Sequence, residues 1–264
     1  SANRAIVPIL WGDRLGPIVS QGYDCQVRTD WRFIPESLND LIDWANVVEE
    51  DEGHDGAAHR LYHLVYAVPV GDDGDSGDCT VTLVLQGFLG AHALGVLGNW
   101  RGKERDAQSA VQFLVLESGG CEVAFQPQVS ALQNIRRLIA MRIGGDVVDS
   151  GDNSSIMLRR RVFQRVRPTD EEGQGIRLTD AVDPFGKARA MSSRWRVDHK
   201  IVVSVRRPNG STLEVVPDVL KHGDFVEVTA TARVEVLRSR KRRGVMVQFE
   251  MHEVVRLLTG QEAK

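Results

Sequence analysis

The chain has 264 residues, of which 42% are hydrophobic and 26% charged, the proportions of a folded globular protein rather than a disordered or fibrous one. No run approaches the roughly 18 consecutive apolar residues of a membrane-spanning helix. The N-terminus lacks a secretory pattern, although a start at Ser1 without Met leaves an upstream segment open. Three widely spaced cysteines favour free thiols in a reducing compartment. We expect an intracellular protein, nuclear or cytoplasmic.

The charge is divided unevenly along the chain. The net charge is −3, but residues 1–150 carry 11 Lys and Arg against 21 Asp and Glu, whereas residues 151–264 carry 22 against 15. Such an asymmetry indicates either a basic surface for a polyanion or acidic and basic faces that attract each other within or between subunits. A polar linker at residues 146–155 suggests a boundary. We predict an acidic α+β domain over 1–150 and a basic β-rich domain over 151–264.

Two segments of the acidic half have the apolar spacing of a helix. Residues 36–50 place apolar side chains on one helical face and follow Pro35. Residues 129–143 show the same spacing and end at Gly144, a residue type that commonly closes helices. The β-rich run 110–116 lies between them and predicts a strand, and residues 122–125 predict a second, short strand.

A hairpin is predicted around an acidic turn. Residues 59–70 and 79–86 flank the Asp- and Gly-rich segment 71–78. That segment does not match the ligand spacing of an EF-hand, so we expect a turn. His59 and His63 are four residues apart but lack the Glu-x-x pattern of zinc proteases. We predict no metal site and no cofactor.

The basic half consists mainly of predicted strands. Pro208-Asn209-Gly210 marks a turn between two of them. The strands are expected at residues 157–166, 195–206, 213–216, 224–237 and 245–257.

The turn between the last two strands is strongly basic. Five cations occur within six residues: Arg238, Arg240, Lys241, Arg242 and Arg243. Clustered Arg and Lys on a loop bind phosphates and release condensed counterions, and a hairpin tip can reach a nucleic-acid backbone. The alternative is a solvated turn that protects the strand edge.

Two further clusters place arginines around an aromatic ring. Arg159, Arg160 and Arg161 precede Phe163, and Arg194 and Arg196 flank Trp195. Cations interleaved with an aromatic ring suit single strands, because unpaired bases stack on the ring while arginine follows the backbone. Alternatively, Phe163 and Trp195 are core residues.

The segment Lys221-His222-Gly223-Asp224, followed by alternating residues from Phe225, resembles the strand opening of OB-fold modules. The resemblance covers residues 194–258, which also resemble the tails of uncharacterised fungal proteins. OB-folds bind oligonucleotides and oligosaccharides on a strand face and its flanking loops. The resemblance therefore implies ligand contacts near Trp195, Arg196 and the basic hairpin.

The sequence contains no nucleophile elbow, phosphate-binding loop or dinucleotide fingerprint, so we expect a non-enzyme. The predicted fold class is α+β, mostly antiparallel, with an α/β N-terminal part and an OB-like or barrel-like C-terminal part. The predicted function is binding of single-stranded DNA or RNA. The alternatives are a self-assembling subunit that forms homo-oligomers through acidic and basic faces, and a nucleic-acid-processing enzyme.

Overall fold

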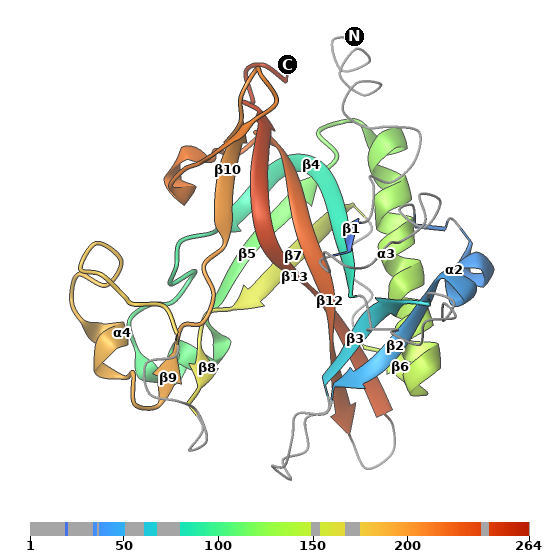
Figure 1. Ribbon diagram of the computed structural model, residues 1–264, viewed down its shortest axis with the longest axis horizontal. Coiled ribbons are helices and arrows are strands. Elements are labelled where there is room, and N and C mark those ends of the chain that lie inside the picture. The colour runs from blue at the N-terminus through green and yellow to red at the C-terminus, as the bar shows by residue number, and fades with distance from the viewer. Residues whose placement is uncertain are drawn as a thin grey trace, which may run out of the picture.

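The structure of the protein is a computed structural model. It describes residues 19–20, 34–35, 37–50, 61–67, 80–148, 154–166, 175–238 and 243–263. Within these ranges the chain forms a large, mostly antiparallel sheet, one long helix and several short helices (Figure 1). The predicted α+β class is therefore confirmed.

Among the described residues, eleven strands form the large sheet. Its main path runs β11-β10-β13-β12-β4-β5-β7, and each neighbouring pair on it is antiparallel except β10 with β13. The strands of this path are β4 (Val81–Ala93), β5 (Val111–Glu117), β7 (Ser155–Arg161), β10 (Val202–Arg206), β11 (Thr212–Glu214), β12 (Phe225–Arg238) and β13 (Arg243–Leu258).

Shorter strands complete the two sheets. In the large sheet β3 joins β2 to β12, β1 pairs with β4, and β6 pairs with β13, while β8 and β9 form a separate two-stranded sheet. These strands are β1 (Val19–Ser20), β2 (Ala45–Glu50), β3 (Leu61–Tyr66), β6 (Asp146–Val147), β8 (Gln164–Arg165) and β9 (Trp195–Arg196).

The β12–β13 hairpin consists of the two longest strands of the sheet. Along β12, buried apolar residues such as Val228 and Val234 alternate with partly exposed polar residues such as Thr231 and Arg233. A register shift after Thr229 leaves an extra residue on β13 as a β-bulge. The strands predicted over residues 224–237 and 245–257 are confirmed because this period-2 pattern matches the pairing.

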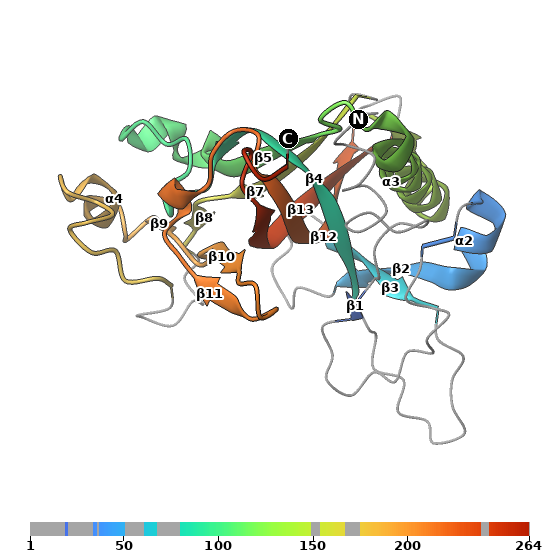
Figure 2. The same ribbon diagram turned by 90° about the horizontal axis from the view of Figure 1, so that it is seen from above.

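The sheet curls until β7 lies beside β13 (Figure 2). Arg159 Nη2 is 4.0 Å from the Sδ of Met246, and Arg160 Nη1 donates a hydrogen bond of 3.3 Å to the carbonyl oxygen of Met251. The strands β4, β5, β7, β13 and β12 therefore follow one another around a partly closed barrel. Three of the five precede residue 194, so the barrel extends well beyond the segment that resembles an OB-fold.

The long helix α3 (Glu122–Ile143) packs against this barrel. Buried residues at helical spacing, including Phe125, Val129 and Leu132, face the core, and Gly144 ends the helix with a φ of 73°. The Gln128 amide accepts from the backbone N–H of Gln86 and donates to its C=O, both at 2.8 Å. The predicted helix over 129–143 is confirmed, but the strand predicted at 122–125 is wrong because Phe125 belongs to the apolar face of the same helix.

The predicted helix over residues 36–50 is only half correct. Ser37 caps the N-terminus of helix α2 (Leu38–Trp44), and its side chain accepts from the N–H of Asp40 at 3.1 Å. From Ala45 the chain continues as β2, which pairs with β3 along its full length. The β-branched pair Val47-Val48 suits that ladder, so sheet pairing outweighs the helical spacing.

The hairpin predicted between residues 59–70 and 79–86 is replaced by other pairings. Strand β3 pairs with β2 and β12, and in the described residues it meets the chain before β4 through one bridge, Val65 with Thr80. The acidic turn 71–78 lies outside the described residues, as do His54 and His59.

Both predicted domains contribute to the same sheet. Strand β4 pairs with β12, and β5 pairs with β7, across the boundary placed at residue 150. The main buried cluster likewise includes Leu114 and Val228. The division at residue 150 stays a prediction.

A second, smaller cluster of buried residues lies beside the barrel. It contains Phe163, Met191 and Val197, with Trp100 and Trp195 packed against it. The 3-10 helix η2 (Glu104–Ser109) and the helix α4 (Lys187–Ala190) belong to this lobe, which Figure 1 shows around β8 and β9, on the opposite side of the molecule from α3. No described helix is long and apolar enough to span a bilayer.

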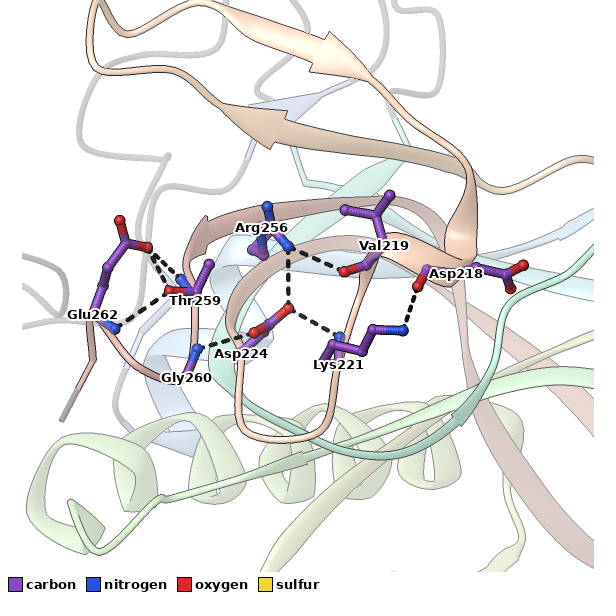
Figure 3. A network of polar contacts seen from close by, with 8 residues as sticks. All are labelled: Asp218, Val219, Lys221, Asp224, Arg256, Thr259, Gly260 and Glu262. Atoms are coloured by element: carbon purple, nitrogen blue, oxygen red, sulfur yellow. Dashed lines mark hydrogen bonds and ion pairs between the residues drawn. The ribbon is translucent and has the colours of Figure 1, made fainter.

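A polar network holds the open end of the β12–β13 hairpin, where β12 begins and β13 ends (Figure 3). The carboxylate of Asp224, only 3% exposed, accepts from the backbone N–H groups of Lys221 at 2.9 Å and Gly260 at 3.0 Å and lies 3.6 Å from Arg256 Nη1. Arg256 also donates to the carbonyl of Val219, at the end of the 3-10 helix η3 (Pro217–Val219). Asp224 thus joins the start of β12 to the chain after β13.

Candidate nucleic-acid interface

The outward face of β5 and β7 combines an aromatic ring with cations. In an antiparallel pair, directly opposed residues lie on the same face of the sheet. Phe113 is opposite Arg159, and Val111 is opposite Arg161. The next pair along, Val115 and Met157, continues the same face.

These side chains point away from the barrel core. Gln112 and Leu114, their neighbours on β5, are buried, whereas Phe113 is partly exposed and Met157 is 54% exposed. The period of two along a strand therefore places Phe113 outward. Phe113 was not among the residues singled out from the sequence, although the predicted strand 110–116 carried the alternation that identifies it.

The three consecutive arginines of β7 have different environments. Arg159 has a methionine sulfur at 4.0 Å and, within the described residues, no carboxylate partner. Arg161 forms an ion pair of 2.8 Å with Glu235 of β12. Arg159 is thus the cation of this face whose charge is uncompensated, and Arg161 shares its charge with an acidic neighbour.

Arg160 lies on the opposite face of β7, the face of the buried Leu158, and contacts β13 from there. Its Nη1 lies 2.9 Å from the Nδ1 of His252. Burial lowers the pKa of Arg160, while Glu250 partly opposes that effect. Because an arginine stays charged in proteins, this guanidinium is a partly buried cation that links β7 to β13. The sequence places Arg160 in one basic cluster with Arg159 and Arg161. Its hydrogen bonds to β13 instead indicate a role in holding the fold together.

The cluster around Trp195 is largely neutralised. Arg194 Nη2 lies 2.7 Å from Glu104, and Arg196 Nε lies 2.8 Å from Asp198. Trp195 packs against the second cluster, and Phe163, which is 3% exposed, forms an edge-to-face contact of 5.1 Å with Trp100. For Phe163 the alternative reading as a core residue is therefore correct.

The basic hairpin tip is described only at its base. Arg238 and Arg243 are the last opposed pair of β12 and β13. Arg243 Nη2 contacts the hydroxyl of Tyr62 at 3.4 Å. Arg240, Lys241 and Arg242 lie outside the described residues.

The loop between β4 and β5 adds exposed cations. Arg101 and Lys103 are exposed and have no ion-pair partner in the described part of the chain, whereas Arg105 lies 3.6 Å from Asp106. Trp100 Nε1 donates to the carbonyl of Lys103 at 2.9 Å, which fixes this loop on the second cluster. Within the ranges that the structure describes, no group of three or more His, Cys, Asp or Glu is placed to hold a metal ion.

Comparisons with known proteins give little support of their own. No protein-family model matches the chain, and no curated protein matches it by sequence. Among solved structures, the chain is similar to gp2.5, a single-stranded DNA binding protein encoded by bacteriophage T7, at 12% identity, with 67% of this chain and 86% of that chain covered and a TM-score of 0.41. Values this low do not establish a shared fold or a shared ligand.

Proposed function

We propose that the protein binds single-stranded nucleic acid on the outward face of β5 and β7. The observation that carries this proposal is the opposed pair of Phe113 and Arg159, an outward aromatic ring beside an uncompensated cation. A base stacks on such a ring irrespective of its identity, while the guanidinium contacts the backbone phosphates.

The arrangement of the neighbouring loops supports the same site. We infer an OB-like barrel formed by β4, β5, β7, β12 and β13. In an OB-fold the second and third strands and the loops 1–2 and 4–5 contact the ligand. Those strands correspond here to β5 and β7, and those loops to the segment with Arg101 and Lys103 and to the basic tip at residues 238–243. The predicted cations of the hairpin thus stay part of the proposal.

The single-strand preference follows from the stacking ring. A base inside a duplex is already stacked on its neighbours, so it cannot lie against Phe113 without unpairing. Arg160 is held in the fold by hydrogen bonds to β13, and Arg194 and Arg196 are held by ion pairs, so we assign the phosphate contact to Arg159.

The experiment is a fluorescence-anisotropy titration of labelled single-stranded DNA, single-stranded RNA and duplex at two salt concentrations. We expect Phe113→Ala and Arg159→Ala to weaken single-strand binding, each by about tenfold. Arg159→Ala should also reduce the salt slope by about 0.7, because one phosphate contact is lost. Phe113→Ala should leave that slope unchanged.

Arg137→Ala is the matched control, since Arg137 is an exposed cation on α3. It should bind like the wild type. Absence of binding to every probe at low salt would contradict the proposal, and size-exclusion chromatography of the same protein without nucleic acid would then test the predicted self-assembly. Equal losses with Arg137→Ala would show a diffuse charge effect instead of the proposed site.

A further inference from the structure

The aromatic side chain of Phe185 is exposed to solvent on the second lobe, next to α4. It is 83% exposed. The Nζ of Lys187 lies 5.6 Å from the centroid of its ring. A single exposed apolar residue is ordinary on a protein surface. Whether Phe185 forms a ligand-binding site therefore depends on how its backbone is held and on the charges around it.

The ring sits on a tight, well-anchored turn. The N–H of Gly186 donates to the carbonyl of Asp183 at 3.0 Å, with Pro184 in the second position of the turn and Phe185 in the third. Pro in the second position and Gly in the fourth favour a type I turn. The turn therefore fixes the backbone of Phe185 while leaving its side chain outside.

A buried carboxylate anchors the start of this turn. Asp183 is 3% exposed, and its Oδ2 accepts from the backbone N–H of Arg189 at 2.9 Å. The Nη2 of Arg189 donates in return to the carbonyl of Asp183 at 3.1 Å. Because the backbone of this turn is already fixed, it loses little conformational entropy when a ligand stacks on the ring.

The β4–β5 loop contacts the side chain of Lys187. A Cβ placed on Gly102 would lie 3.1 Å from the Cδ of Lys187, so the loop and α4 are in close contact. Gly102 separates Arg101 from Lys103, and both are exposed. Lys187 thus lies at the Phe185 ring and against the loop segment that carries these two exposed cations.

Acidic side chains in the described part of this lobe form ion pairs with arginines. Arg194 binds Glu104 at 2.7 Å, Arg189 binds Asp180 at 2.6 Å, and Arg105 lies 3.6 Å from Asp106. Within the described ranges, no carboxylate pairs with Arg101, Lys103 or Lys187. Among the described residues, the ring therefore lies beside an ammonium group that has no carboxylate partner.

We propose that Phe185, with Lys187, Arg101 and Lys103, forms a second stacking site for an unpaired base, engaged by a strand that also occupies the β5–β7 face. This inference rests on the proposed function. Figures 1 and 2 both place α4 at the end of the molecule farthest from α3, with β5 and β7 between them. Only a strand long enough to extend beyond the barrel should reach both rings.

The test compares labelled single strands of about 6 nucleotides, which is within the site size of one OB-like module, and about 20 nucleotides, which exceeds it. Phe185→Ala and Phe185→Leu should weaken binding of the longer strand by about tenfold and leave the shorter strand unaffected. Phe185→Trp should retain the affinity, and its added fluorescence should be quenched by the longer strand, because an indole also stacks on bases. Val216→Ala, another exposed apolar residue, is the control.

The outcomes separate this inference from the proposed function. If the wild type binds both strands and Phe185→Ala binds them equally well, the second site is wrong while the β5–β7 face stands. If Phe185→Leu matches the wild type, or Val216→Ala loses as much as Phe185→Ala, stacking on Phe185 is excluded. If no strand binds the wild type, the proposed function fails and the second site fails with it.

Discussion

Arg160 Nη1 lies 2.9 Å from the Nδ1 of His252, whose Nε2 lies 2.8 Å from the Oγ1 of Thr231. An arginine only donates hydrogen bonds, so Nδ1 accepts and Nε2 carries the proton that is donated to Thr231. Burial, followed by the charge of Arg160, lowers the pKa of His252 to about 4. His252 is therefore a neutral side chain that completes the contact between β7 and β13.

This geometry predicts acid sensitivity. The unfolded imidazole titrates near its ordinary pKa of about 6.5, whereas the folded one stays neutral down to about 4. Between these values the unfolded state binds a proton that the native state does not, so the free energy of unfolding falls as the pH falls. We expect a loss of about 1–2 kcal/mol, reduced from the full shift by the partial solvent contact of the ring.

Urea denaturation of the wild type and of His252→Gln at pH 7 and pH 4.5 measures this effect. The wild type should lose more stability than the variant over that interval, because the variant lacks the titrating ring. Equal losses in the two proteins would show that other groups control the acid response.

Of the neighbouring arginines of β7, Arg160 should contribute to stability and Arg159 to binding. Arg160→Ala removes two hydrogen bonds of the β7–β13 contact and should lower the free energy of unfolding by about 1–3 kcal/mol. Arg159→Ala removes an outward cation and should change that free energy by less than about 0.5 kcal/mol. Chemical denaturation and single-strand binding, measured on both variants, check the division. Equal stability of the two variants would contradict the structural role of Arg160.

How much of the molecule the sequence predicts depends on the range of the interactions. The β12–β13 hairpin and most of α3 follow from local periodicity, because neighbouring residues in the chain set the pattern. The pairing of Phe225 with Phe88, in contrast, joins β12 to a strand far away in the chain, and no local pattern encodes it. The barrel was therefore predicted only in its C-terminal part.

The candidate site shows the same limit. The run Arg159 to Arg161 predicts a basic surface, but composition does not reveal that Arg160 turns toward His252 while Arg159 lies opposite Phe113. The carboxylate that pairs with Arg194 comes from η2, which is far away in the chain, and the one that pairs with Arg196 is Asp198, two residues further on. Charge counting along the chain cannot separate compensated from uncompensated cations.

Asp224 should be a major determinant of stability. Its carboxylate is buried, accepts two backbone N–H groups and lies near Arg256, so removing it leaves those donors without an acceptor. Asp224→Ala should lower the free energy of unfolding by about 2–4 kcal/mol. Asp218→Ala, an exposed acid in the same network region, should change it by less than about 0.5 kcal/mol. Urea denaturation distinguishes the two variants, and a small effect of Asp224→Ala would contradict the role drawn from Figure 3.

Gly98 joins the β4–β5 loop to the barrel and should tolerate no side chain. It has a φ of 52°, and a Cβ there would overlap the carbonyl oxygen of Val111, a backbone atom of β5 that cannot move without disturbing the strand. Gly144, with a φ of 73°, has open space around its Cβ position. Gly98→Ala should therefore cost more than about 2 kcal/mol of unfolding free energy, whereas Gly144→Ala should cost only the backbone strain of about 1–2 kcal/mol.

Thermal and urea denaturation of the two variants check this difference. Because the loop also carries Arg101 and Lys103, Gly98→Ala should weaken long-strand binding as well, while Gly144→Ala, at the end of α3, should not. Equal stability of the two variants would mean that the loop moves away from β5 at little cost, and it would then be a poor platform for fixed phosphate contacts.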